Sequence, residues 1–147
     1  MCTNEMSLTF DSRSANEAFA RSALASFASQ LDPTLDELND IKTIVSEAVT
    51  NCIVHAYPEK IGKIYIKARL FSNNNIVITI RDKGCGIPDI EKAREPMFTT
   101  GDSERSGMGF TIMESFSDKL KVKSGSRGTT VTITKRISMR LGGKGIV

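Results

Sequence analysis

The sequence lacks tryptophan and has a single histidine, His55, among its 147 residues. One histidine excludes a metal site built from several histidines, and it leaves no spare base for a Ser-His catalytic triad. The three cysteines, Cys2, Cys52 and Cys85, are widely spaced and fit neither metal-ligand nor redox-pair spacing. We therefore expect free thiols in a reducing compartment. With only seven Phe and two Tyr, the core must be mainly aliphatic.

The chain also has no apolar run near the roughly 20 residues that a membrane-spanning helix needs. Its first ten residues contain neither a basic leader nor an apolar signal core. We expect a cytoplasmic protein without a membrane partner. The net charge of +3 is small, and the late basic residues fit an exposed strand face and a basic tail, so we expect no direct nucleic-acid partner.

A length of 147 residues suits one domain, and the patterns predict the order strand, helix, helix, hairpin, loop, helix, hairpin. Thr34 followed by Glu37 is a capping-box signature for the best-marked helix, which Pro58 ends. The expected elements are a strand at 5–10, a helix from Ser12 or Ser14 to about Gln30, a helix from 34 to before Pro58, a hairpin at 63–80, a helix at 108–116, and strands at 119–124 and 129–136.

This order predicts an α/β (α+β) two-layer sandwich, in which helices cover one face of a mixed sheet. Helix and strand do not alternate as a doubly wound fold requires. We expect one domain over residues 1–136 and a flexible basic tail at 137–147. The long segment 82–109 is rich in Gly, Pro, Thr and charge, which in a domain of this size more often indicates function than an idle loop.

Glu47 and Asn51 stand four residues apart, so their side chains share one surface of the second helix. A carboxylate there suits a general base, and an amide oxygen suits Mg²⁺, which prefers hard oxygen ligands and keeps several waters. An ordinary polar helix flank explains the pair equally simply.

Asp82-Lys-Gly84-Cys-Gly86 follows the end of a predicted strand. Asp82 can accept a hydrogen bond from an exocyclic amine, while Gly84 and Gly86 let the backbone lie close to a planar ring. A tight turn that begins with Asp is the alternative.

Gly107-Met108-Gly109 directly precedes a predicted helix, whose uncovered amides favour a phosphate. Arg105 supplies a cation that can bind a terminal phosphate through two N–H groups. A capped surface loop is the alternative. The segment before this helix also contains Thr99, Thr100, Gly101 and Ser106. A G-x-x-x-x-G-K-[ST] phosphate loop is absent, and no G-x-G-x-x-G spacing occurs at 84–89 or 107–112.

In order, these motifs resemble the GHKL superfamily of gyrase, heat-shock chaperone, histidine kinase and mismatch-repair ATPases, which has the Bergerat ATP-binding fold. The matching segments are Glu47-Ala-Val-Thr-Asn51, Asp82-Lys-Gly-Cys-Gly86, Gly107-Met-Gly109 and Gly128-Thr-Thr130. Within that superfamily, segments 16–21, 30–38, 41–59 and 98–118 are most similar to bacterial anti-sigma factors that are also serine kinases, closest to the anti-sigma-F factors of sporulation.

The resemblance implies a homodimer that binds ATP or ADP with Mg²⁺, inhibits a sigma-F-like sigma factor, and phosphorylates a serine of a STAS-type anti-anti-sigma partner. It makes Glu47 the general base and Asn51 the magnesium ligand. It assigns the adenine to Asp82, Gly84, Gly86 and Thr130, and a short lid and phosphate cradle to residues 105–109 (Arg105, Ser106, Gly107, Met108, Gly109), with Thr99, Thr100 and Gly101 before them.

Two other functions remain open on the sequence. One is a GHKL ATP hydrolase or a detached histidine-kinase catalytic domain, although the chain has no helix pair that carries a phospho-accepting histidine. The other is a binding module whose shape ATP sets. For partner contacts, Arg21 and the helix at 16–30 are our candidates, against ordinary surface as the alternative.

Overall fold

The helices and strands follow the predicted order in a computed structural model that describes residues 1–84 and 109–139. The elements are β1 (Cys2–Asp11), α1 (Ala15–Ala28), η1 (Ser29–Leu31), α2 (Leu35–Asn51), η2 (Cys52–Ala56), β2 (Lys63–Phe71), β3 (Asn75–Asp82), α5 (Gly109–Phe116), β4 (Lys119–Gly125) and β5 (Gly128–Arg136). β1 is longer than the strand we expected at 5–10.

The described strands form one five-stranded sheet in the order β1-β2-β3-β5-β4. Every ladder between neighbouring strands is antiparallel, so the expectation of a mixed sheet is wrong. β3 and β4 do run in the same direction, because each is antiparallel to β5. They do not pair, because β5 returns between them and takes the hydrogen-bonding edge of both.

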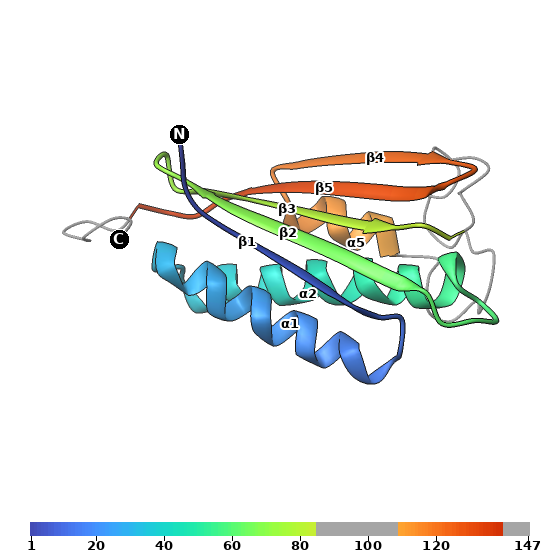
Figure 1. The fold of residues 1–147 in the computed structure, drawn as a ribbon. Coiled ribbons are helices and arrows are strands. Elements are labelled where there is room, and N and C mark those ends of the chain that lie inside the picture. Colours follow the sequence, from blue (N-terminus) through green and yellow to red (C-terminus); the bar gives the residue numbers. More distant parts are fainter. Residues whose placement is uncertain (85–108, 140–147) are drawn as a thin grey trace.

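Side chains alternate between the two faces of this sheet, and the helices lie along one face only (Figure 1). In β2 and β3 the side chains that face the helices are apolar until the last residue of β3, which is Asp82. The fully buried large side chains are Leu24, Ile41, Ile44, Ile64, Ile66, Leu70, Ile76, Ile78, Ile80, Met113, Ile133 and Ile137. The core is aliphatic, as the scarcity of aromatic residues predicts.

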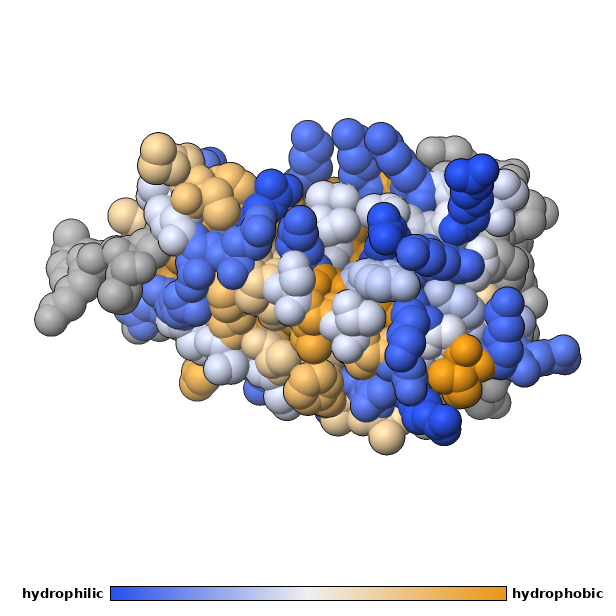
Figure 2. All heavy atoms as spheres, viewed as in Figure 1, coloured by the Kyte–Doolittle hydropathy of each residue, from blue (hydrophilic) through white to orange (hydrophobic). Residues whose placement is uncertain are grey.

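The opposite face carries no helix, and its outer edge is basic. Lys119, Lys121 and Lys123 alternate along β4 and are exposed. In the space-filling view, hydrophilic side chains crowd the upper edge, where β4 lies (Figure 2). Lysines on an edge strand discourage pairing with the edge of another sheet.

α2 begins at a complete capping box and ends in an irregular turn. The Thr34 side chain accepts a hydrogen bond from the Glu37 amide, and the Glu37 carboxylate accepts one from the Thr34 amide. At the other end, five residues of π-helix, η2, follow Asn51, and the Tyr57 amide bonds the carbonyl of Cys52. Such π-helical turns within helices occur frequently at functional sites.

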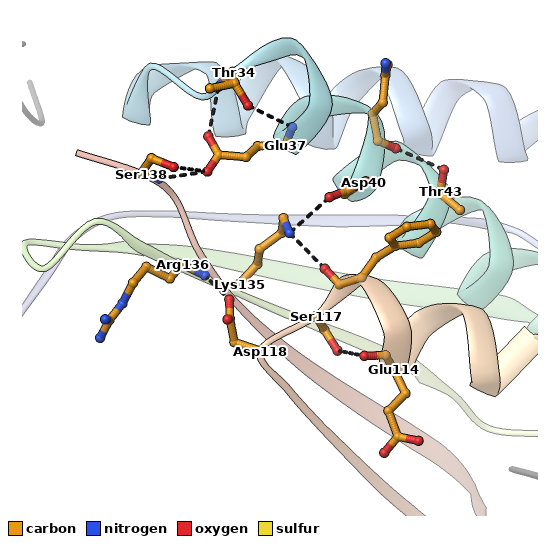
Figure 3. A network of polar contacts seen from close by, with 12 residues as sticks. Thr34, Glu37, Asp40, Thr43, Glu114, Ser117, Asp118, Lys135, Arg136 and Ser138 are labelled. Carbon is orange, nitrogen blue, oxygen red and sulfur yellow. Dashed lines mark hydrogen bonds and ion pairs between the residues drawn. The ribbon is translucent and has the colours of Figure 1, made fainter. Parts of the chain in front are cut away.

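The folded part of the chain extends past residue 136, where we expected the domain to end. Ile137 is 1% exposed, and it exchanges hydrogen bonds with Asn74 in the β2–β3 turn. The amide and hydroxyl of Ser138 both donate to the Glu37 carboxylate (Figure 3). Residues 137 and 138 of the expected tail are therefore folded against the domain, and its residues 140–147 lie outside the described part of the chain.

Within the described ranges, none of the helices combines the length and the apolar character needed to cross a membrane.

Candidate functional site

Asp82 lies at the end of β3 with its side chain on the helix-covered face, and it is only 6% exposed. Its Oδ1 accepts hydrogen bonds from the amides of Gly84 and Thr129, both at 3.1 Å. The thiol of Cys52 lies 3.6 Å from its Oδ2 and donates to it. Burial raises the pKa of Asp82 above its ordinary value, and the three hydrogen bonds work against that rise. The result is a positioned acceptor at the end of an otherwise apolar strand face.

Two glycines allow the backbone to close around this carboxylate. A Cβ at Gly84 would overlap the carbonyl group of Ala56, at the end of η2. Gly128 has a φ of +126°, and a Cβ there would overlap the backbone of Asp82 and Lys83. No other residue type fits either position without movement. Gly84, in the motif Asp82-Lys-Gly-Cys-Gly86, therefore allows the backbones to pack closely.

Tyr57 fastens η2 to the end of β3, a role that the sequence analysis missed. Its hydroxyl accepts a hydrogen bond of 2.6 Å from the Lys83 amide and donates one of 2.8 Å to the Lys63 carbonyl. Burial raises the pKa of Tyr57. A tyrosine just before a proline carries no distinguishing pattern, so nothing in the sequence alone pointed to it.

Glu47 and Asn51 are both half-buried on α2, one helical turn apart as predicted. Asn51 lies against the first residue of α5, because a Cβ built on Gly109 would come within 3.1 Å of its Oδ1. This contact joins the motif that ends at Asn51 to the motif that ends at Gly109, although the two residues are 58 positions apart in the chain. Burial lowers the pKa of nearby His55, which favours its neutral form near neutral pH.

Thr130 lies on the other side of the sheet from Asp82. In β5 the buried side chains are Thr129, Val131 and Ile133, so Thr130 falls on the uncovered face by alternation. There it lines an open cavity of about 800 Å³, whose other lining residues are Arg81, Asp82, Lys83, Lys123, Ser124, Gly125, Ser126, Arg127 and Gly128. Thr129, whose amide bonds Oδ1, is therefore the threonine beside Asp82, and a contact of Thr130 with the adenine base stays a prediction.

Part of the predicted site lies outside the described residues. These residues are Gly86, Thr99, Thr100, Gly101, Arg105, Ser106, Gly107 and Met108, together with Cys85. Arg21, our candidate for partner contact, is on α1 and pairs with Glu17 at 3.5 Å. It is 42% exposed at the side chain, so this placement neither favours nor disfavours a partner role.

In the described part of the chain, no three His, Cys, Asp or Glu side chains gather into a metal site. Magnesium bound with a nucleotide does not need such a cluster, because phosphate oxygens and waters fill most of its positions. The Asn51 amide fits that requirement: it is a neutral hard-oxygen donor that reaches the N-terminus of α5, where a Cβ on Gly109 would lie 3.1 Å from its Oδ1.

Comparison with known proteins agrees with this geometry. The family described as "Histidine kinase-like ATPase domain" matches residues 10–135. The chain is 58% identical over 137 residues to the anti-sigma F factor of Thermoanaerobacter sp. (strain X514), covering 92% of this chain and 95% of that protein. It is 55% identical over 138 residues to the anti-sigma F factor of Bacillus subtilis (strain 168), covering 92% and 94%.

Solved structures support the fold alone. The RsbU and RsbW domains of a Mycobacterium tuberculosis protein align with a TM-score of 0.70 at 21% identity, over 94% of this chain and 34% of that one. The histidine kinase domain of a blue-light activated kinase from Erythrobacter litoralis aligns with a TM-score of 0.57 at 22% identity, over 82% and 60%.

The ATPase-type sheet and helices, the joined motifs around Asp82 and Asn51, and relatives matched over nearly their whole length lead to one conclusion. This chain belongs to the anti-sigma F factors, within the histidine kinase-like ATPase family, and carries that family's ATP-binding domain.

Proposed function

We propose that this protein binds a sigma-F-like sigma factor and uses ATP with Mg²⁺ to phosphorylate a serine on a STAS-type anti-anti-sigma partner in the cytoplasm. The observation that carries the proposal is the contact of Asn51 with Gly109. It brings the helix that carries Glu47 against the N-terminus of α5. Amides at a helix N-terminus favour phosphate groups.

In this proposal Glu47 is the general base. A glutamate carboxylate is a suitable group to accept a proton in general-base catalysis. Glu47 takes the proton from the serine hydroxyl as that oxygen attacks the γ-phosphorus in line. The bond from phosphorus to the bridging oxygen breaks, and ADP leaves with that electron pair.

The other residues bind and orient the nucleotide. Asp82 accepts a hydrogen bond from the adenine amine, Gly84 and Thr129 fix the direction of its carboxylate, and Asn51 supplies one oxygen to magnesium. When bound, Mg²⁺ offsets the negative charge on the transferred group. Arg105 and residues 106–109 are proposed to complete the phosphate site.

The test measures nucleotide binding and phosphotransfer on the same preparations. Glu47→Ala should retain ATP affinity within a few-fold and lose phosphotransfer to a STAS partner by roughly 10²–10⁴-fold, since general-base catalysis contributes that much. Asp36→Ala is the matched control, because Asp36 is an exposed carboxylate in the first turn of α2, the end of the helix far from Asn51. It should leave both quantities unchanged.

Three results would contradict the proposal. An equal loss of binding and transfer in Glu47→Ala would remove the base assignment. Release of free phosphate without a phosphorylated partner would indicate a hydrolase, and ATP binding with no turnover would indicate a binding module. A pull-down with sigma factor, with and without ATP, tests the proposed binding of the sigma factor. Light scattering tests the proposed homodimer. Arg21→Glu tests the α1 surface as a partner contact, and unchanged binding of the sigma factor and of the anti-anti-sigma partner would remove Arg21 from it.

A further inference from the structure

Cys52 is a buried thiol in contact with the proposed adenine acceptor. It is 5% exposed, follows Asn51 directly, and is the first residue of the π-helical turn η2. Its Sγ donates to Oδ2 of Asp82 at 3.6 Å, across 30 positions of sequence. The same turn is fastened to β3 by the hydroxyl of Tyr57 and by the close approach of Ala56 to Gly84. The thiol is therefore held in place by the backbone on both sides.

Counting acceptor positions shows what the thiol leaves free. A carboxylate offers about four lone-pair directions, two on each oxygen. The amides of Gly84 and Thr129 occupy both directions on Oδ1 of Asp82. The Cys52 thiol occupies one direction on Oδ2. Among the described residues one direction on Oδ2 remains, which suits one N–H group of a ligand.

We propose that Cys52 is a positioning residue for nucleotide recognition, whose thiol orients Oδ2 of Asp82 so that the site accepts a 6-amino purine in preference to a 6-oxo purine. The inference rests on the proposed function, in which Asp82 receives the adenine amine. Cys52 acts through Asp82 and need not touch the base.

The chemistry of a thiol suits this role. A thiol is a weak donor and a small, otherwise apolar side chain, so it fits a core position while satisfying one carboxylate oxygen. Without it, Oδ2 would be buried beside a methyl group, and the carboxylate would more readily take up a proton. A protonated Asp82 presents an O–H donor, which pairs with the carbonyl of a 6-oxo purine instead of an amine.

Within residues 1–84 and 109–139, few other ionisable groups surround Asp82. Cys52 in η2 and Tyr57 directly after it face Asp82, and both have pKa values raised, first of all by burial. β5 contributes the Thr129 amide, and β2 contributes Ile64 opposite Asp82. The neighbouring Arg81 and Lys83 place their cations over the ring of Tyr65. Burial raises the pKa of Asp82, and the thiol hydrogen bond lowers it.

The experiment compares ADP with inosine diphosphate, which has a carbonyl in place of the 6-amine. Dissociation constants are measured for the full-length unaltered protein and for Cys52→Ala, Cys52→Ser and Cys2→Ala. Cys2→Ala is the matched control, because Cys2 is exposed on β1 and its thiol donates to the Asn4 carbonyl. Thermal unfolding without nucleotide reports any general loss of stability.

We expect Cys52→Ala to reduce the preference for ADP over inosine diphosphate by roughly three- to tenfold, the range of one hydrogen bond. Cys52→Ser should restore most of the preference, because its hydroxyl also donates. Cys2→Ala should leave the preference unchanged. If Cys52 had only a structural role, its loss would weaken the binding of both nucleotides by the same factor and leave the ratio of their dissociation constants unchanged.

A pH series adds an independent result. ADP binding needs the ionised carboxylate, so affinity is lost as pH falls through the pKa of Asp82. Removing the thiol bond raises that pKa, so Cys52→Ala should lose ADP affinity at a higher pH than the unaltered protein. In the unaltered protein, ADP should also shift the infrared S–H stretch that Cys52→Ser removes, whereas inosine diphosphate should not.

The outcomes separate the two proposals. If the unaltered protein does not prefer ADP, the role of Asp82 in the proposed function fails. If it prefers ADP and Cys52→Ala keeps both the preference and the pH midpoint, only the inference about Cys52 fails. If Cys52→Ala does not fold, the test rests on the ratio of ADP to inosine diphosphate affinity in Cys52→Ser and on the S–H band of the unaltered protein. A band that does not move when ADP binds overturns the inference.

Discussion

Around Asp82 the absence of a side chain matters as much as side-chain chemistry, because the backbone packs closely at its glycines. Gly128 has a left-handed φ that other residues rarely adopt, and its backbone packs on that of Asp82. Three residues earlier, Gly125 has open space where its Cβ would lie. Two glycines of one β-turn therefore have different roles, and only one is required by the site.

Gly128→Ala should destabilise the fold by roughly 2 kcal/mol or more, since strain of this kind alone costs about 1–3 kcal/mol and the overlap with Asp82 adds to it. It should also weaken nucleotide binding, because Asp82 must move. Urea unfolding and ADP titration measure the two effects. Gly125→Ala is the control and should change neither; equal effects of the two substitutions would contradict the packing argument.

At the scale of the elements, α2 connects the two ends of the molecule. Its first turn is capped by Thr34 and Glu37, and the second oxygen of Glu37 accepts the amide and hydroxyl of Ser138. Along the same side, Lys135 pairs with Asp40 at 3.3 Å and donates to the Phe116 carbonyl at the end of α5 (Figure 3). These contacts fix the helix that carries Glu47 and Asn51 against the sheet.

Glu37→Gln should lower the free energy of unfolding at pH 7 by about 1 kcal/mol, the usual size of a capping contribution. Burial raises the pKa of Glu37, but the bonds from Ser138 and Thr34 outweigh it, so the pKa is lowered in the folded state. The stabilisation is therefore present above the unfolded pKa of about 4.3 and lost as pH falls through the folded value.

The measurement is urea unfolding at pH 7 and near pH 3. The difference between Glu37→Gln and the unaltered protein should shrink on acidification. Asp36→Asn, in the same helical turn, does not involve Thr34 or Ser138 and should cost less at pH 7. A difference for Glu37→Gln that stays constant with pH would argue against the carboxylate bonds as its source.

At the scale of the whole molecule, the end of β5 closes the core. Ile137 is fully buried although it follows the last residue of the strand, and it is tied to the β2–β3 turn by Asn74. Asn74 has a φ of 68° and is 2% exposed. Its hydrogen bonds with Ile137 therefore join the turn to the segment that follows β5. Met139, two residues later, is 72% exposed.

Ile137→Ala should therefore destabilise the protein by about 2–4 kcal/mol, as core truncations do. Met139→Ala should have an effect within about 0.5 kcal/mol, the usual range for exposed positions. Thermal and urea unfolding measure both. If the two substitutions cost the same, Ile137 does not belong to the core in solution, and a domain ending at residue 136 would suffice.

The order of the elements, the capped start of α2 and the buried faces of β2 and β3 can be read from the amino-acid sequence alone. These follow from local rules: a capping box involves neighbours three residues apart, and alternation in Ile64–Leu70 or Ile76–Ile80 has a period of two. The short motifs also resemble one family, and the comparisons with known proteins show that the chain belongs to it.

Tertiary structure alone decided the contacts between distant segments. It set β5 between β3 and β4, which made the sheet antiparallel, and it joined the Thr129 amide to Asp82. It also brought Cys52 and Tyr57 to Asp82 and buried Ile137. The contacts of Cys52 and Tyr57 leave no periodic trace in the sequence, because each joins residues 26 or more positions apart.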